Sequence, residues 1–147
     1  LLDRTLDLGI LYEPPSLPEL HCIPIGELTL RLFSSDSGDT VDNAMSRNYV
    51  YLDWGRGFER FHSRRFGDNV VPALQTNINE LARDYLAQRG GACFLPYGLR
   101  TALRAAGLAP VRGAPEFRRQ LNVAYHVGSV KKELIEAVAG RFAAVNL

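Results

Sequence analysis

The spacing of apolar residues divides the chain into short strands and amphipathic helices. In residues 27–32 apolar and polar side chains alternate, which is typical of a strand with one exposed face. Short apolar runs bounded by Gly, Pro, Asp or Asn predict further strands. The predicted strands are residues 6–12 (stopping at Pro14 and Pro15), about 20–33, 49–52, 70–76, 92–95 and 120–126.

Apolar residues at helical spacing fill most of the segments between these strands. One helix begins after Gly55, a second follows Asn77 or Asn79 as its N-cap, a third covers about residues 97–105, and a last one ends the chain. We expect the last helix to pack its continuous apolar stripe on a sheet. The predicted buried faces are Phe58, Phe61 and Phe66 in the first helix, Leu81, Tyr85 and Leu86 in the second, and Val130, Leu134, Ile135, Val138 and Phe142 in the last.

Residues 90–96 (Gly-Gly-Ala-Cys-Phe-Leu-Pro) are the clearest structural signal in the sequence. Paired glycines end a helix because only glycine enters the left-handed region at low cost. The apolar run after them predicts a buried strand, and Pro96 stops its pairing. Strands that alternate with helices predict an α/β fold with a mostly parallel sheet. Ligands bind such sheets just beyond the carboxyl ends of the strands.

The order of the elements predicts two lobes. The first lobe comprises residues 1–27 and 114–147, and the second comprises residues 28–113. Two crossovers between the lobes would act as the hinge. The chain starts at Leu1 rather than Met, so we expect it to be a fragment of a longer protein.

Bulk composition excludes several function classes. The chain has 147 residues and a formal net charge of +1, so no global field draws it to nucleic acid or to a membrane. No apolar run approaches the about 20 residues that span a bilayer. Cys22 and Cys93 sit among apolar neighbours, which favours buried free thiols over a disulfide. The histidines His21, His62 and His126 are far apart, so we expect no metal site.

Polar residues gather where the predicted strands end. Parallel strands bring these ends to one edge of the sheet. Hydroxyls, amides, an aromatic face and carboxylates are present there, but no nucleophile is paired with a base, so we predict binding without catalysis. These residues are Tyr12, Glu13, Asp53, Trp54, Thr76, Asn77, Asn79, Pro96 and Tyr97.

Two arginine-containing patterns leave alternatives open. Gly55-Arg56-Gly57 is either a tight strand-to-helix turn or a receiver of an anion at a helix start. Arg56, Arg60 and Arg64 form one helical stripe, which Glu59 and Asp68 dilute. A solvated outer face is therefore favoured over contact with phosphates.

Three segments together resemble the effector-binding domain of LysR-type transcriptional regulators. Residues 2–10 (Leu-Asp-Arg-Thr-Leu-Asp-Leu-Gly-Ile) are similar to that family's strand entry. Residues 20–30, with Pro-Ile-Gly-Glu-Leu-Thr-Leu at 24–30, are similar to its crossover, and residues 90–96 to its Gly-x-Gly-hydrophobic-hydrophobic-Leu-Pro segment. In this order they cover nearly the whole chain.

The resemblance implies a fold like the type 2 periplasmic solute-binding proteins, in which two α/β lobes close on a small ligand. It implies a bacterial cytoplasmic regulator that senses a small-molecule effector without a cofactor and works as a homodimer or homotetramer. The family's winged helix-turn-helix and the first strand and helix of its first lobe are absent from this chain, so DNA contact is expected only through the missing domain. By position, the resemblance implies a cleft lined by Tyr12, Glu13, Pro14, Trp54, Gly55, Thr76, Asn77, Leu95 and Pro96, and Arg56 favours an anionic effector.

Two rival functions remain at this stage. A solute-binding protein of a transporter would have the same fold. An α/β enzyme would use Asp53, Glu13 or His62 as its acid or base, although the lack of a paired base counts against it.

Overall fold

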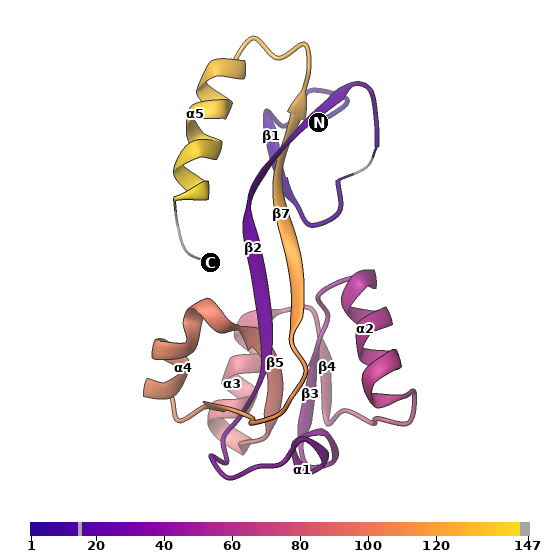
Figure 1. Ribbon diagram of the computed structural model, residues 1–147, viewed down its shortest axis with the longest axis vertical. Coiled ribbons are helices and arrows are strands. Elements are labelled where there is room, and N and C mark those ends of the chain that lie inside the picture. Colours follow the sequence, from indigo (N-terminus) through magenta and orange to yellow (C-terminus); the bar gives the residue numbers. More distant parts are fainter. Residues whose placement is uncertain (15, 145–147) are drawn as a thin grey trace. The chain divides into compact units, whose positions relative to one another are not determined.

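A computed structural model describes residues 1–14 and 16–144. Pro15 and residues 145–147, which include the end of the predicted first lobe, lie outside the described residues. The chain divides into two compact units (Figure 1). Unit 1 consists of Leu1–Leu28 with Arg118–Leu147, and unit 2 is Thr29–Phe117.

Unit 1 is built on antiparallel strands. Strand β1 (Leu8–Leu11) pairs with β7 (Phe117–His126), with Leu8 opposite Tyr125 and Leu11 opposite Asn122. The first part of β2 (Leu20–Ser34) also lies in this unit. Helix α5 (Lys132–Ala143) buries Ile135 and Ala139, and the hydroxyl of Tyr125 donates a hydrogen bond of 2.8 Å to Glu136. Burial and this negative acceptor raise the pKa of Tyr125 to about 12.

The prediction for the last helix is wrong in the extent of burial. Val130 is 99% exposed and precedes α5, and Leu134 is 62% exposed within it. An amphipathic pattern gathers apolar residues on one face, but it does not say how much of that face another element covers. Only the side of α5 with Ile135 and Ala139 is buried.

Unit 2 contains most of the helices and the remaining strands. Its strand order is β2-β5-β3-β4, and β6 pairs with β2. In chain order after β2 its elements are α1 (Val41–Ser46), β3 (Tyr49–Leu52), α2 (Arg56–Phe66), β4 (Leu74–Thr76), α3 (Asn79–Arg89), β5 (Ala92–Pro96), the short 3-10 helix η1 (Tyr97–Leu99), α4 (Arg100–Ala105) and β6 (Ala109–Pro110).

The sheet is mixed, so the prediction of a mostly parallel sheet is wrong. Strand β3 runs parallel to β4 and β5, as alternating strands and helices predict. Strand β2 pairs antiparallel with β5 and with β6, and β1 pairs antiparallel with β7. The long β2 enters unit 2 without a crossover helix before it, so the right-handed βαβ rule does not fix its direction.

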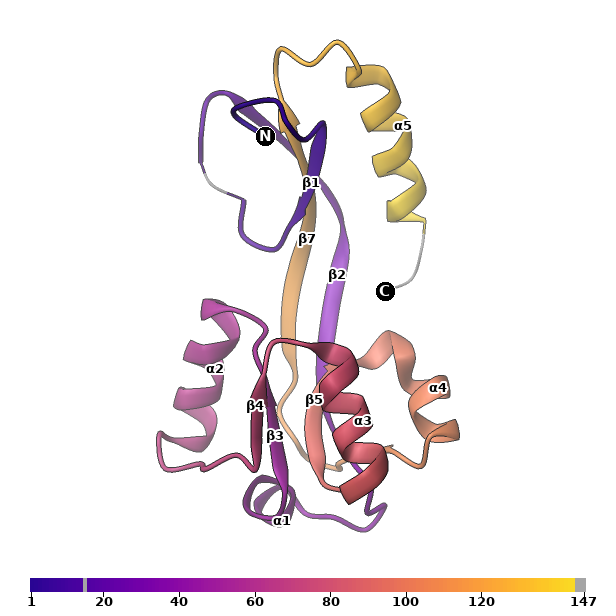
Figure 2. The ribbon, with the colours of Figure 1, turned by 180° about the vertical axis from the view of Figure 1, so that it is seen from behind.

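Alternating side chains of β5 supply two apolar layers in unit 2. Cys93 and Leu95 join a core cluster with Ala82 and Leu86 of α3. Phe94 points the other way, and its ring lies 5.4 Å from that of Phe58 in α2. The helices therefore cover both faces of the sheet, and Figure 2 shows α3 running alongside β5. Each large side chain buried in this way contributes about 1.5–3 kcal/mol.

Several local predictions differ from the structure. Strand β4 begins at Leu74 rather than at residue 70, behind Pro72, which has no N–H for a ladder. In α3 the buried residues are Ala82 and Leu86, whereas Leu81 is 46% exposed. Both cysteines are free, and Cys93 is buried while Cys22 is half-buried.

Candidate functional site

The carboxyl ends of three parallel strands lie along one edge of the sheet in unit 2. Leu52 at the end of β3 is opposite Thr76 at the end of β4. The N–H of Asp53 donates to the carbonyl of Thr76 at 2.8 Å, so the segment after β3 remains hydrogen-bonded to the end of β4. The predicted site residues of unit 2 lie at or just after the ends of these strands, and β5 ends at Pro96.

Trp54 is fixed by the neighbouring strand. Its indole Nε1 donates to the carbonyl oxygen of Phe94 at 3.1 Å, and the half-buried ring packs against the core cluster. Because the N–H already has a partner, the indole offers a partner molecule an apolar face rather than a donor.

Helix α2 begins without a side-chain cap. Its N-cap, Gly55, has φ +90° and ψ 179°, a conformation that glycine adopts and other residues rarely do. Asp53 Oδ1 accepts the Gly55 N–H at 2.7 Å, while no side chain in the part of the chain described here caps the helix. The start of the helix therefore combines the partial positive charge of its N–H groups and the exposed Arg56 with the negative charge of Asp53, which offsets part of it.

Helix α3 corrects a predicted cap. Its N-cap is Ile78, not Asn77 or Asn79, and the Ile78 N–H donates to Thr76 Oγ1 at 3.0 Å. The Thr76 hydroxyl closes the turn before the helix, and neither asparagine is its N-cap. Asn77 is exposed, whereas Asn79 Oδ1 is buried without a hydrogen-bond partner in the described structure.

The end of β5 contributes less surface than predicted. Leu95 is 1% exposed and belongs to the core cluster, so its side chain offers nothing to a ligand. Pro96 is half-buried at the edge. Beyond it, the Tyr97 ring contacts two guanidinium groups, with Arg31 at 4.0 Å and Arg100 at 4.9 Å from the ring centroid.

The predicted site residues of unit 1 lie around an arginine, Arg119, that the sequence analysis did not identify. Tyr12, Glu13 and Pro14 follow β1. The guanidinium of Arg119 lies 4.5 Å from the centre of the Tyr12 ring, and its Nη2 is 3.1 Å from Glu13 Oε1. The Arg119 side chain is only 9% exposed. Antiparallel pairing of β1 with β7 brings these distant residues together, and knowledge of that pairing was the only signal for Arg119.

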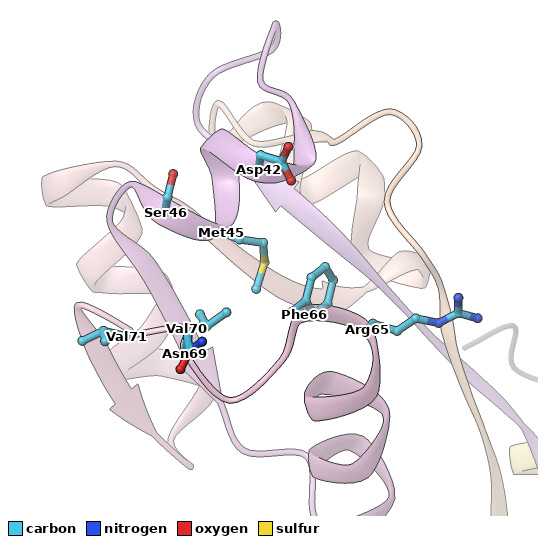
Figure 3. A pocket seen from close by; sticks show the side chains of 8 residues that line it. All are labelled: Asp42, Met45, Ser46, Arg65, Phe66, Asn69, Val70 and Val71. Atoms are coloured by element: carbon cyan, nitrogen blue, oxygen red, sulfur yellow. The ribbon is translucent and has the colours of Figure 1, made fainter.

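A hollow of about 500 Å³ lies elsewhere in unit 2 (Figure 3). Met45, Phe66 and Val70 point into it, whereas Arg65 and Val71 point away. None of the predicted site residues lines this hollow. Its apolar floor is therefore a different surface from the polar edge of the sheet.

The described residues give two further findings. Within residues 1–14 and 16–144, no group of three or more His, Cys, Asp or Glu side chains gathers where it could hold a metal ion. Over the same residues, no helix is both long and apolar enough to cross a membrane.

Comparison with known proteins gives one family. The family model described as the LysR substrate binding domain matches residues 1–145. The HTH-type transcriptional regulator HdfR of Yersinia enterocolitica is 38% identical over 65% of this chain, and the match spans 36% of that regulator's length. HdfR of Yersinia pestis is 36% identical over the same share.

Solved regulatory domains have the same fold. The bromide-bound regulatory domain of HypT from Salmonella typhimurium matches 98% of this chain and 76% of its own, with a TM-score of 0.76 and 14% identity. A sulfate-bound mutant regulatory domain of OxyR2 from Vibrio vulnificus matches 97% and 74%, with a TM-score of 0.73 and 13% identity. The Synechocystis CcmR regulatory domain in complex with 2-PG matches 97% and 76%, with a TM-score of 0.67 and 19% identity.

Proposed function

This chain belongs to the LysR substrate binding domain family, and from that premise we propose that it senses a small-molecule effector for a bacterial LysR-type transcriptional regulator. The family match over residues 1–145 is the observation that carries this proposal. In this proposed sensor, units 1 and 2 are the two lobes. We further propose a cytoplasmic homodimer or homotetramer in which another domain contacts DNA, in keeping with the name of the HTH-type relative.

The effector that we propose is anionic. In unit 1, Arg119 is a nearly buried cation beside Tyr12 and Glu13. In unit 2, the start of α2 lacks a side-chain cap and carries Arg56. Both features favour a negative ligand group. Two solved relatives, one bound to sulfate and one to bromide, agree with this chemistry.

Ligand-dependent melting tests the proposal. A panel of carboxylates, phosphates and neutral metabolites is added to the full chain while its thermal transition is recorded. A ligand at 100 times its Kd adds about 2.7 kcal/mol of stability, which corresponds to a rise of about 5–10 °C in Tm for a chain of this size. No shift from any member of a broad panel would remove the support for a sensor.

Variants then assign the contacts. Arg119→Met keeps an apolar stem but removes the charge, and we expect it to weaken a hit about 10- to 100-fold, as the loss of a charged hydrogen bond does. Arg60→Ala, on α2 but beyond its first turn, is the matched control and leaves Kd unchanged. Trp54 is the single tryptophan, so Trp54→Phe removes any ligand-induced indole fluorescence change.

The rival functions have less support. The relatives are transcriptional regulators, which does not favour a transporter's solute-binding protein. The proposed domain is a sensor and not an enzyme. If the chain were an enzyme, replacing Asp53, Glu13 or His62 by alanine would abolish a turnover measured in the unsubstituted chain; we expect no such loss.

A further inference from the structure

A second hollow with charged walls lies in unit 2, and none of the residues of the proposed sensor site lines it. It has a volume of about 410 Å³ and lies between β2 and the segment that leads from β6 into β7. Its charged lining is Arg31, Arg112 and Glu116, which leaves one positive charge in excess. The rest of the lining is apolar or small, including Gly113.

Arg31 is held in a fixed position at this hollow. It lies on β2 opposite Leu95 of β5, and its guanidinium carbon is 4.0 Å from the centre of the Tyr97 ring. The guanidinium is planar and presents five donors in a rigid fork. Its Nη2 is bound to Glu116 Oε1, whereas its Nε is buried without a hydrogen-bond partner in the described structure. The fork thus has donor capacity beyond its present pairing.

Glu116 shows which chemical group fits this fork. A carboxylate already lies against Arg31, supplied by the chain itself. The two side chains are 36% and 26% exposed, so solvent screens the ion pair and its exchange for another carboxylate costs little. Arg112, in the segment between β6 and β7, lines the same hollow and adds a second positive charge for an incoming anion.

We propose that this hollow is a second ligand site, which binds a small molecule with two or more carboxylates. One carboxylate of the ligand displaces Glu116 from Arg31, and another contacts Arg112. Glu116 is therefore an internal competitor that holds the site closed to monovalent anions. The proposal does not depend on the sensor function, because none of the sensor-site residues lines this hollow.

Citrate binding to variants of the charged lining residues tests this proposal. Citrate is titrated into the full chain by calorimetry, and ¹H–¹⁵N spectra follow the amides of residues 111–114 and 116. Glu116→Gln removes the competing charge, so citrate binds about tenfold more tightly. Arg31→Met weakens citrate at least tenfold, and Arg112→Ala weakens it severalfold. Arg100→Met is the matched control, since Arg100 contacts the same Tyr97 ring but does not line the hollow, and leaves affinity unchanged.

Two results would contradict the proposal or part of it. Unchanged or weaker citrate binding by Glu116→Gln overturns the proposal, and this holds even if Arg31→Met fails to fold. Inorganic phosphate that binds as tightly as citrate, and responds to the same variants, overturns the assignment to carboxylates. Arg119→Met keeps citrate binding here while losing a sensor ligand, so the two proposals fail separately.

Discussion

Gly91 occupies a position that no other residue fits. Its φ is +120°, and a Cβ placed on it would lie 2.1 Å from the carbonyl oxygen of Asn48. The Gly91 N–H also donates to Ser35 Oγ at 2.9 Å, and its carbonyl accepts the Ser35 N–H at 2.9 Å. Gly91→Ala must therefore push Asn48 away or release the start of β5.

The cost follows from two separate terms. An L-residue at such a φ carries about 1–3 kcal/mol of strain. Forcing a methyl group into a filled space costs about another 1–3 kcal/mol. Asn48 has little freedom to move, because its side chain donates to the carbonyl of Gly90 at 2.6 Å and accepts from the Tyr85 hydroxyl at 2.7 Å. We expect Gly91→Ala to lower the free energy of unfolding by about 2–6 kcal/mol.

Urea denaturation followed by Trp54 fluorescence measures this loss, since Trp54 reports on the same unit. Gly107→Ala is the control, because Gly107 has φ +81° but nothing within 4 Å of a new Cβ. It carries only the backbone cost of about 1–2 kcal/mol. If Gly91→Ala lowers stability no more than Gly107→Ala, the close approach of Asn48 to Gly91 is refuted.

Four further predictions concern single residues. Phe58 is fully buried against five other rings, so Phe58→Ala lowers stability by about 3–5 kcal/mol in a thermal melt, and a loss under 1 kcal/mol would contradict that packing. Gly140 lies in α5 with open space around it, so Gly140→Ala raises stability by about 0.5–1 kcal/mol, measured by Tm. Burial lowers the pKa of His62, so the unfolded chain binds more protons and stability falls as pH drops below the ordinary value of 6.5; His62→Phe removes that slope in melts across pH 5–8. Burial raises the pKa of the Cys93 thiol to about 12, so a thiol reagent at pH 8 modifies Cys22 quickly and Cys93 only after urea unfolding.

Local signals predicted the elements that have strong boundaries. Strand β3 matches its predicted residues, because a short apolar run stands between polar segments. Helix α2 lies between Gly55 and Gly67, and its phenylalanines face the sheet as the spacing indicates. The α/β fold and the likeness to LysR regulatory domains are confirmed.

What the sequence could not predict depends on distant pairing. The direction of β2 depends on which strands it meets, and no local pattern encodes that. Arg119 joins Tyr12 and Glu13 across more than a hundred residues, so it was missing from the predicted site. The predicted Leu95 belongs to the core, because the alternation of β5 places Cys93 and Leu95 on the same buried face.

The division of the chain has a consequence for the order of folding. Unit 2 is one continuous stretch, whereas unit 1 joins both ends of the chain, with Leu8 paired to Tyr125. During synthesis the first 28 residues must therefore wait until β7 has been made. The Arg31–Glu116 pair shows that folded unit 2 brings its own two ends together. A finished unit 2 thus shortens the loop that unit 1 has to close, and the early strands pair at a lower entropic cost.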